Sequence, residues 1–465
     1  MTSQAPASSS QGNKSFDRVL SPGEVFLLTL SALSPVISVF IGGNAILHMA
    51  GTGAAIGFIC GGLIAATMAL LFAELSASYP GAGGVYGALN AILGPRWTYP
   101  YVILRTVLLF PLLAFGAVGV GPYIRLFLPS LSQEVSALGT LALAALIAAA
   151  QIRRGAQVIA AFLLIELVAL LVLMIAALAH FKAANIGLVL SPVITLDGTS
   201  LVPASSVSTA LAVIAGASMT AGADWATYFA EDMRDAKRRM GPVVAWTGLI
   251  AATFIAVPVV LMILGMDDVA ATLSAEAPIA HFLDRTTSPL ISSLVSLGII
   301  VAIFNGVTAM MMALSRQLHA MGRDRVFPEA INTVLRTVSH RTRAPTGALL
   351  VLIVIGGLVT FLGERRLVLL SSGNFSECLL LGLALLAGRK AGALSAHFRI
   401  RLHPLVPIIA LLLSVSIVAA NWADADTARI SMCLLVAVFS AAFAWHEWGI
   451  RAGRGTVRLS GSDLE

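Results

Sequence analysis

The chain has few charged residues and few cysteines. Only 11% of its 465 residues are Asp, Glu, Lys or Arg, whereas a typical soluble domain carries roughly 25%. Its cysteines, Cys60, Cys378 and Cys433, all fall within apolar segments and show no paired spacing. We therefore expect neither a disulfide framework nor a cysteine metal site. The low charge also argues against an ordinary soluble globular protein.

The sequence also lacks the usual signatures of enzymes and nucleotide-driven machines. It contains no phosphate-binding Gly-x-x-x-x-Gly-Lys-Ser/Thr loop, no Gly-x-Ser-x-Gly elbow and no zinc-spaced histidine pair. We predict that the protein is not an enzyme, binds no metal or cofactor and is not driven by ATP. The net charge of +6 does not indicate nucleic-acid binding. Most of the Lys and Arg residues fall in loops that would lie on one side of a membrane.

What the chain does have is apolar sequence, since 58% of its residues are hydrophobic. A membrane-spanning helix needs ~20 apolar residues, and the chain offers about twelve such segments. If the N-terminus is cytoplasmic, most Lys and Arg fall in loops on that side, as the positive-inside rule requires. We predict an all-α, multi-pass protein of the inner or plasma membrane. Its polar tails, 1–22 (disordered) and 450–465, would both be cytoplasmic.

Two hydrophobic segments are interrupted, one in each half of the chain. The first runs from about Glu24 to Met49, and the sixth from about Val207 to Tyr228. The interruptions are Ser34-Pro35 and Gly42-Gly43 in the first, and Gly216-Ala217-Ser218 and Thr220 to Asp224 in the sixth. A broken helix in lipid leaves backbone groups unsatisfied unless they face a cavity or a ligand. Matching breaks indicate a transporter with internal repeats, although Gly and Pro also serve helix packing.

Several short motifs occur in the order typical of a known family. The second segment ends in Glu74, Tyr79-Pro80 and Gly83-Gly84-Val85-Tyr86. Glu231-Asp232 and Lys237-Arg238 follow the sixth segment, and Ser315-Arg316 and Met321-Gly322-Arg323-Asp324 follow the eighth. Over most of residues 24–362 the chain resembles the amino acid–polyamine–organocation (APC) permeases.

The resemblance implies the LeuT-like fold, with ten core helices in two inverted five-helix repeats and two further C-terminal helices. Helices one and six would be unwound at mid-membrane. The repeats would span 23–200 and 201–390, and the last two helices 391–449. In this fold the freed amides and helix ends bind a carboxylate, and the freed carbonyls bind an ammonium. The implied substrate-binding residues are Ser38, Val39, Phe40, Gly42, Gly43, Ser218, Met219, Thr220, Gly222 and Asp224.

The chain departs from the family pattern at both breaks. Relatives that bind α-amino acids usually carry Gly-Ser/Thr-Gly at the first break, where this chain has Ile37-Ser38-Val39-Phe40. Its sixth-segment break is flanked by mostly small residues, whereas many relatives place aromatic residues there. Both departures favour a roomier site, or a bulkier or non-standard ligand.

Ionisable residues inside apolar segments are costly and therefore functional candidates. Here they are Arg105, Glu166, Asp224 and Glu377. Glu166 either carries a proton or ligates a cation, or it forms a structural ion pair with Arg105. Asp224 is a candidate for coupling or gating. Glu377 either attracts a cationic group or is protonated and takes no part in transport.

The sequence thus predicts a secondary-active amino acid or amine permease that works by alternating access, with proton-coupled uptake and Na+ as the other candidate coupling ion. The alternatives are a substrate/product exchanger for polyamines or organic cations, and a non-transporting sensor on the same fold. We expect a monomer or homodimer whose partners are the small-molecule substrate and the lipid bilayer, with no nucleic acid.

Overall fold

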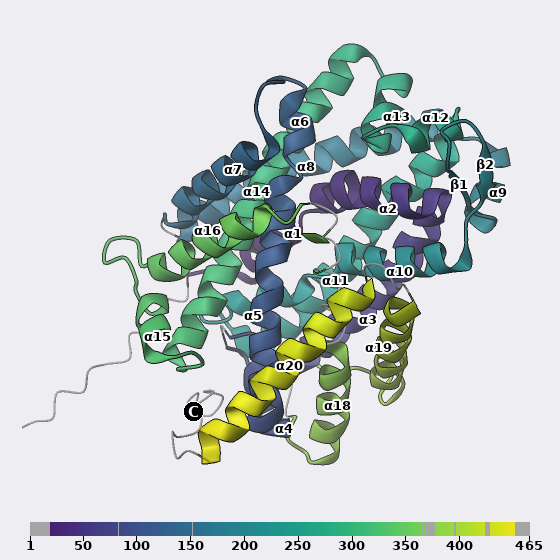
Figure 1. Cartoon of the computed structure of the whole chain (residues 1–465). Coiled ribbons are helices and arrows are strands. Elements are labelled where there is room, and N and C mark those ends of the chain that lie inside the picture. The colour runs from purple at the N-terminus through teal and green to yellow at the C-terminus, as the bar shows by residue number, and fades with distance from the viewer. Residues whose placement is uncertain are drawn as a thin grey trace, which may run out of the picture.

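The computed structural model of the chain is built almost entirely of helices (Figure 1). It describes residues 19–81, 83–150, 152–363, 366–367, 370, 377–394, 397–423 and 428–451. The predicted tails therefore lie largely outside the described residues. Among the described residues, β1 (Val193–Thr195) and β2 (Leu201–Pro203) form an antiparallel hairpin. This hairpin packs against α12 and lies at the edge of the molecule in Figure 1.

The helices follow one another through mostly short connections. In the first half they are α1 (Pro22–Leu33), α2 (Gly43–Ala50), α3 (Ala54–Ser78), α4 (Tyr86–Leu93), α5 (Pro95–Val118), α6 (Gly121–Arg125), α7 (Gln133–Ala148), α8 (Ile152–Ala179) and α9 (Ile186–Leu190). In the second half they are α10 (Ser206–Thr220), α11 (Ala236–Gly265), α12 (Val269–Ser274), α13 (Pro278–Thr286), α14 (Pro289–Arg323), α15 (Glu329–Leu335), α16 (Thr346–Thr360), α18 (Glu377–Lys390), α19 (Leu405–Ala423) and α20 (Ala428–Arg451). Short 3₁₀ turns occupy Gly51–Gly53 and Ala183–Asn185.

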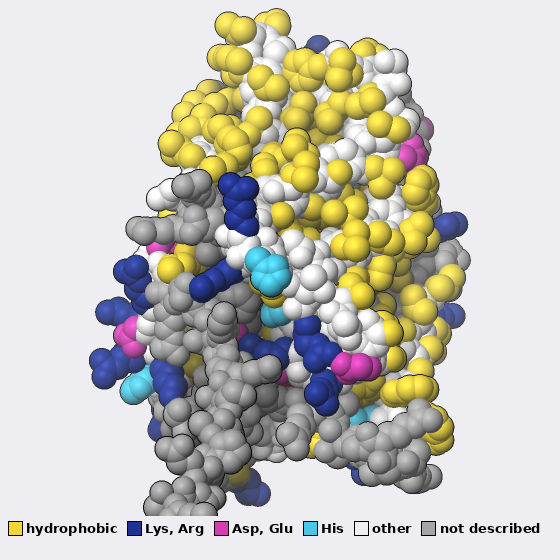
Figure 2. All heavy atoms as spheres, turned by 90° about the vertical axis from the view of Figure 1, so that its left-hand side faces the viewer, with side chains coloured by type: hydrophobic (Ala, Val, Ile, Leu, Met, Phe, Trp, Pro, Cys, Tyr) yellow, Lys and Arg dark blue, Asp and Glu magenta, His cyan; other side chains and the backbone are white. Residues whose placement is uncertain are grey.

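Many of these helices are long and apolar enough to cross a membrane. Seven described helical stretches meet this requirement, and the first of them, Pro22–Ser78, has 57 residues, enough for two passages. Three shorter apolar helices, within α7, α16 and α19, add to them. Figure 2 shows a face covered by hydrophobic side chains in its upper part, with Lys and Arg gathered lower down. The prediction of an all-α polytopic membrane protein is confirmed.

The first hydrophobic segment breaks at Ser34 and Pro35. The helix α1 starts with a capping box, in which Ser21 and Glu24 bond each other's backbone amides. It ends at Leu33, and Ser34 takes φ 44°, a value that L residues rarely adopt. Pro35 has no N–H and cannot continue the hydrogen-bond ladder. The chain resumes as a π-helix, Ile37–Gly42, which runs directly into α2.

The sixth segment breaks at Ala221 and Gly222. The helix α10 ends at Thr220, and a 3₁₀ helix follows over Ala223–Phe229. Gly222 lies between them with φ 131°, a backbone conformation that glycine adopts without steric cost. Helices one and six are therefore both interrupted, each at one of its two predicted places.

The other two predicted interruptions are wrong, because the backbone there is helical. Gly42 and Gly43 both have helical dihedral angles where the π-helix meets α2. Gly216 lies inside α10, and a Cβ atom there would be 2.3 Å from the carbonyl oxygen of Gly57 on α3. Its role is close helix packing, for which small residues are enriched in membranes.

The packing of the bundle places both breaks at its centre. The helix α3 packs along α10 and α11, and α1 packs against α8, α11 and α14. The break after Leu33 is therefore surrounded by neighbouring helices, where freed backbone groups find partners inside the protein.

Candidate functional site

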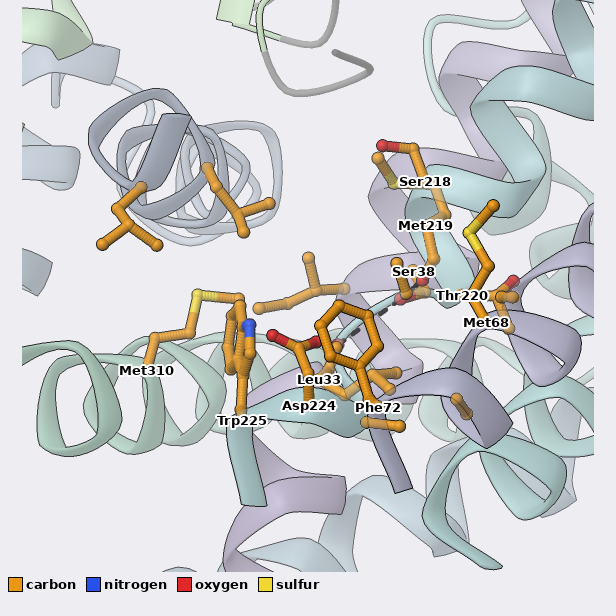
Figure 3. Close-up of a pocket in the computed structure, with 18 of the residues that line it drawn as sticks. Leu33, Ser38, Met68, Phe72, Ser218, Met219, Thr220, Asp224, Trp225 and Met310 are labelled. Carbon is orange, nitrogen blue, oxygen red and sulfur yellow. Dashed lines mark hydrogen bonds between the residues drawn. The ribbon is translucent and has the colours of Figure 1, made fainter. Parts of the chain in front are cut away.

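A cavity lies between the two broken helices. Its walls come from α1 and the π-helix, α3, α5, α14, α18, and the junction of α10 with the 3₁₀ helix. Figure 3 shows the side chains of Met68, Phe72, Met219, Trp225 and Met310 around this space. Three methionines and three aromatic residues belong to a described lining whose other members are mostly small or aliphatic. This cavity is therefore the candidate site for a small solute.

A buried ion pair forms part of the cavity wall. A guanidinium nitrogen of Arg105, on α5, hydrogen-bonds the carboxylate of Asp224, directly after the break in helix six. The two side chains are only 9% and 8% exposed. Arg105 also donates to the hydroxyl oxygen of Tyr228, at 3.0 and 3.3 Å. A second, smaller cavity shares Phe72, Arg105 and Asp224 with the first, so the pair lies between the two.

The structure brings only part of the predicted substrate-binding set to this cavity. The predicted residues that line it are Ser38, Ser218, Met219, Thr220, Gly222 and Asp224. Val39, Phe40, Gly42 and Gly43 lie outside its described lining. Phe40 is fully buried in the core. A Cβ atom on Gly42 would be 2.4 Å from the Met219 sulfur, so this glycine brings the two broken helices together.

Sequence reasoning missed most of the apolar wall. Met68 and Phe72 on α3, Phe115 on α5 and Met310 on α14 line the cavity. On a membrane helix such residues look the same whether they face lipid, core or solute, so no sequence signal singled them out. Trp225 is the exception. It directly follows Asp224, so its position beside the predicted break indicates that it lines the cavity.

The two broken helices are joined inside the cavity. The Ser38 hydroxyl donates a hydrogen bond of 2.7 Å to the carbonyl oxygen of Met219 (Figure 3). Thr220 donates to the carbonyl oxygen of Gly216, also at 2.7 Å. Each hydroxyl oxygen keeps the capacity to accept a further hydrogen bond.

The backbone amides freed by the first break have partners within the protein. The amide of Val36 is in electrostatic contact with the Glu166 carboxylate. Those of Ile37 and Ser38 donate to the hydroxyl and carbonyl oxygens of Ser34, at 3.3 and 3.1 Å. These groups are therefore occupied in this conformation.

Glu166 is a fully buried residue on α8 that touches the first break and α14. Its carboxylate accepts from the Ser34 hydroxyl at 3.0 Å and from the Asn305 side-chain amide at 2.8 Å. Together with Val36, these described partners are all uncharged. The suggested ion pair between Arg105 and Glu166 does not form, because Arg105 pairs with Asp224 instead.

Glu377 is the first residue of α18. Its side chain lies outside the described part of the structure. The prediction that it attracts a cationic group or is silent therefore stays a prediction.

The motif residues that revealed the family resemblance form a cluster of ion pairs. Arg316 pairs with Asp232 at 2.9 Å, and Arg323 makes two bonds to Glu231, at 2.7 and 3.0 Å. Nearby in sequence, Asp324 accepts a hydrogen bond of 2.6 Å from Tyr86. The cluster joins the end of α14 to the segment after helix six.

Glu74, the acidic residue of the motif that ends the second segment, pairs outside this cluster. It makes a bidentate pair with Arg389 on α18, with two contacts of 2.6 Å, and accepts from the amide of Ile400. This arrangement satisfies a fully buried carboxylate.

Comparison with known proteins identifies the family of the chain. A family model described as "Amino acid permease" matches residues 20–442. The chain belongs to this permease family, in the APC superfamily. The permease is also 25% identical over 422 residues to the methylthioribose transporter of Bacillus subtilis (strain 168), a match that covers 85% of this chain and 87% of the relative. The protein is therefore a membrane transporter and not an enzyme.

Proposed function

We propose that this permease is a secondary-active, proton-coupled transporter that works by alternating access, with Glu166 as the group that carries the proton. The observation that supports this is the set of uncharged partners around a fully buried carboxylate. With no cation among its described partners, Glu166 gains or loses a proton without leaving a partner charge stranded.

The position of Glu166 links its protonation to movement. As an anion it accepts hydrogen bonds from Ser34 at the first break and from Asn305 on α14. A protonated carboxyl gains a donor and loses acceptor capacity, so these bonds weaken on protonation. The broken helices then move against α8 and α14. The proton biases a two-state equilibrium through its different affinity for the two states.

The solute would bind between the two breaks. Because Ser38 is bonded to Met219, the unwound parts of helices one and six move together and close the cavity from one side at a time. The family description makes an amino acid or amine the first candidate solute. A methylthio sugar is the second, supported by the relative's name and by the sulfur-rich wall that Met68, Met219 and Met310 form.

Uptake into proteoliposomes with an imposed pH gradient tests this function. Labelled amino acids, amines and methylthioribose would serve as probes. We expect the wild type to accumulate one of them, and Glu166→Gln to lose gradient-driven accumulation while keeping counterflow exchange. Glu134→Gln, an exposed residue on α7, is the matched control and should behave as the wild type.

Accumulation by Glu166→Gln equal to that of the wild type would overturn the proton role. Binding of a probe by the wild type without any flux would overturn transport itself and favour the sensor.

A further inference from the structure

We propose that a groove between α8 and α14 binds one phospholipid whose headgroup carries both a phosphate and a primary ammonium, as phosphatidylethanolamine does. In their described linings, the groove and the solute cavity share no residue. The proposal therefore goes beyond the proposed function and concerns the surface that faces the bilayer.

The groove is a large apolar hollow that opens to the outside of the bundle. Its volume is about 670 Å³, within the range of ~300–1,000 Å³ that is usual for small-molecule sites. Its described lining comes from α8, from α14 and from the segment that joins α13 to α14. The side chains of Val168, Ile175 and Leu294 form its rim and are 52%, 57% and 59% exposed. Such a hollow lies open to lipid along its length.

Small residues explain why α8 and α14 leave this space. Ala169 and Ala176 lie on its floor and are only 3% and 6% exposed. Opposite them on α14, Gly298 has no side chain, and a Cβ atom there would still be 3.7 Å from a methyl group of Ile165. The space is therefore bounded by backbone and short side chains, and a guest can occupy it without displacing a protein group.

The length of the groove matches one acyl chain. Its α8 residues recur at the three- and four-residue spacing of one helix face, from Ile165 to Ala179. An α-helix rises by ~21 Å over that distance. One leaflet provides about half of the ~30 Å hydrocarbon thickness of a bilayer. At the Ile165 end the neighbouring Glu166 bonds Asn305, which ties α8 to α14 and closes the groove.

The polar residues of the described lining gather at the other end. They are Thr286, Thr287 and Ser288, beside Ala179. The Ser288 hydroxyl accepts from the amide of Ile291 at 3.4 Å, which leaves its own proton as a donor for an ester or phosphate oxygen. A groove that is apolar along its length and polar at one end fits an amphiphile with a single headgroup.

Exposed charges of both signs lie next to this polar end. Lys182 contacts Asp267 at 2.5 Å, with side chains 43% and 58% exposed. The charges of His180, Lys182 and Arg285 all act on Asp267, and Asp284 is the exposed neighbour of Arg285. The cations suit a phosphate and the carboxylates suit an ammonium with N–H donors. A purely anionic headgroup would meet the carboxylates, and choline has no N–H to offer them.

Lipid binding to the delipidated protein in detergent tests the proposal. The probes are phosphatidylethanolamine, phosphatidylcholine, phosphatidylglycerol and diacylglycerol with identical acyl chains. Native mass spectrometry would count bound lipids, and thermal shift would rank their affinities. We expect one phosphatidylethanolamine to bind at least ~10-fold more tightly than each of the other three, which corresponds to ~1.4 kcal/mol.

Two kinds of variant separate the chain site from the headgroup site. Gly298→Leu fills the groove and should lower the affinity for phosphatidylethanolamine at least ~10-fold, a loss of ~1.4 kcal/mol. Gly139→Leu, at an exposed glycine of α7 with no neighbour within 4 Å, is the matched control and should bind as the wild type. Arg285→Gln should keep chain binding but lose most of the preference over diacylglycerol. If Gly298→Leu fails to fold, Ala179→Trp fills the groove from an exposed position.

Three results would overturn the proposal. The first is equal affinity of the wild type for all four lipids. The second is an unchanged affinity for phosphatidylethanolamine in the folded groove-filling variant. The third is a wild-type dimer that becomes a monomer in that variant, because the groove would then hold a second copy of the chain. Binding is read without transport, so failure of proton-coupled uptake would leave this proposal standing.

Discussion

The two buried acids beside the breaks have opposite surroundings. Asp224 faces the guanidinium of Arg105 at the cavity wall, whereas Glu166 is held by Ser34, Val36 and Asn305, which are all neutral. The charged partner ties Asp224 to α5, whereas the neutral partners tie Glu166 to the first break and to α14. The contrast motivates separate tests of the two acids, with the coupling role proposed for Glu166.

The largest effect should come from breaking the charged pair. Asp224→Asn removes the carboxylate that contacts the buried guanidinium of Arg105, and loss of one partner of such a pair costs ~3–5 kcal/mol of stability. Denaturant unfolding of the purified protein would measure the loss. The double variant Arg105→Gln with Asp224→Asn should recover most of it. If the double variant is as unstable as the single one, the pair is not the source of the effect.

A smaller loss of stability should follow when one neutral partner of Glu166 is removed. The Asn305 side-chain amide bonds Glu166 at 2.8 Å and Ser31 at 2.5 Å. Asn305→Ala removes both bonds, and a buried polar group left unsatisfied costs ~1–3 kcal/mol. The same unfolding assay applies. Ser414→Ala, which removes a bond within α19 only, is the control and should cost less. A loss larger than that of Asp224→Asn would reverse the ranking of the two sites.

The link between the broken helices should matter less for stability than for transport. Ser38→Ala removes the bond to the Met219 carbonyl, and a single hydrogen bond contributes ~0.5–1.5 kcal/mol. We expect a change in unfolding free energy of that size together with slower uptake in proteoliposomes. Ser76→Ala removes a local bond within α3 and should leave uptake unchanged. Unchanged uptake in Ser38→Ala would show that the two helices move independently.

The smallest effect should come from an exposed ion pair, which sharpens the contrast with Arg105 and Asp224. Lys182 and Asp267 lie 2.5 Å apart with side chains 43% and 58% exposed. The hydrogen bond from Lys182 lowers the pKa of Asp267, so the pair stabilises the fold above the unfolded-state pKa of ~3.9. That contribution disappears as the pH falls through the lower folded-state pKa.

Asp267→Asn should therefore cost less than ~1 kcal/mol at neutral pH and nothing once the pH is below the folded-state pKa. Thermal unfolding of the variant and the wild type across this pH range would check the sign. A difference between them that grows as the pH falls would contradict it.

The breaks show how far local sequence carries the prediction. Pro35 has no backbone N–H in any surroundings, so the sequence alone predicts the interruption at Ser34. Gly216 does not force a break in the helix. Glycine in a membrane helix serves a break or close packing equally well, and only the approach of Gly57 shows that this one serves packing. Two of the four predicted interruptions failed for this reason.

The sequence by itself determined that this protein is helical, apolar and membrane-spanning, that helices one and six are interrupted, and that the APC motifs lie in order. These properties follow from composition, from proline and glycine chemistry and from spacing along the chain. Only the tertiary structure decided which charges meet. Arg105 and Glu166 lie at similar depths in their segments, yet Arg105 pairs with Asp224 and Glu74 with Arg389. Depth along a helix is a property of the chain, whereas rotation about its axis and the choice of neighbour come from packing.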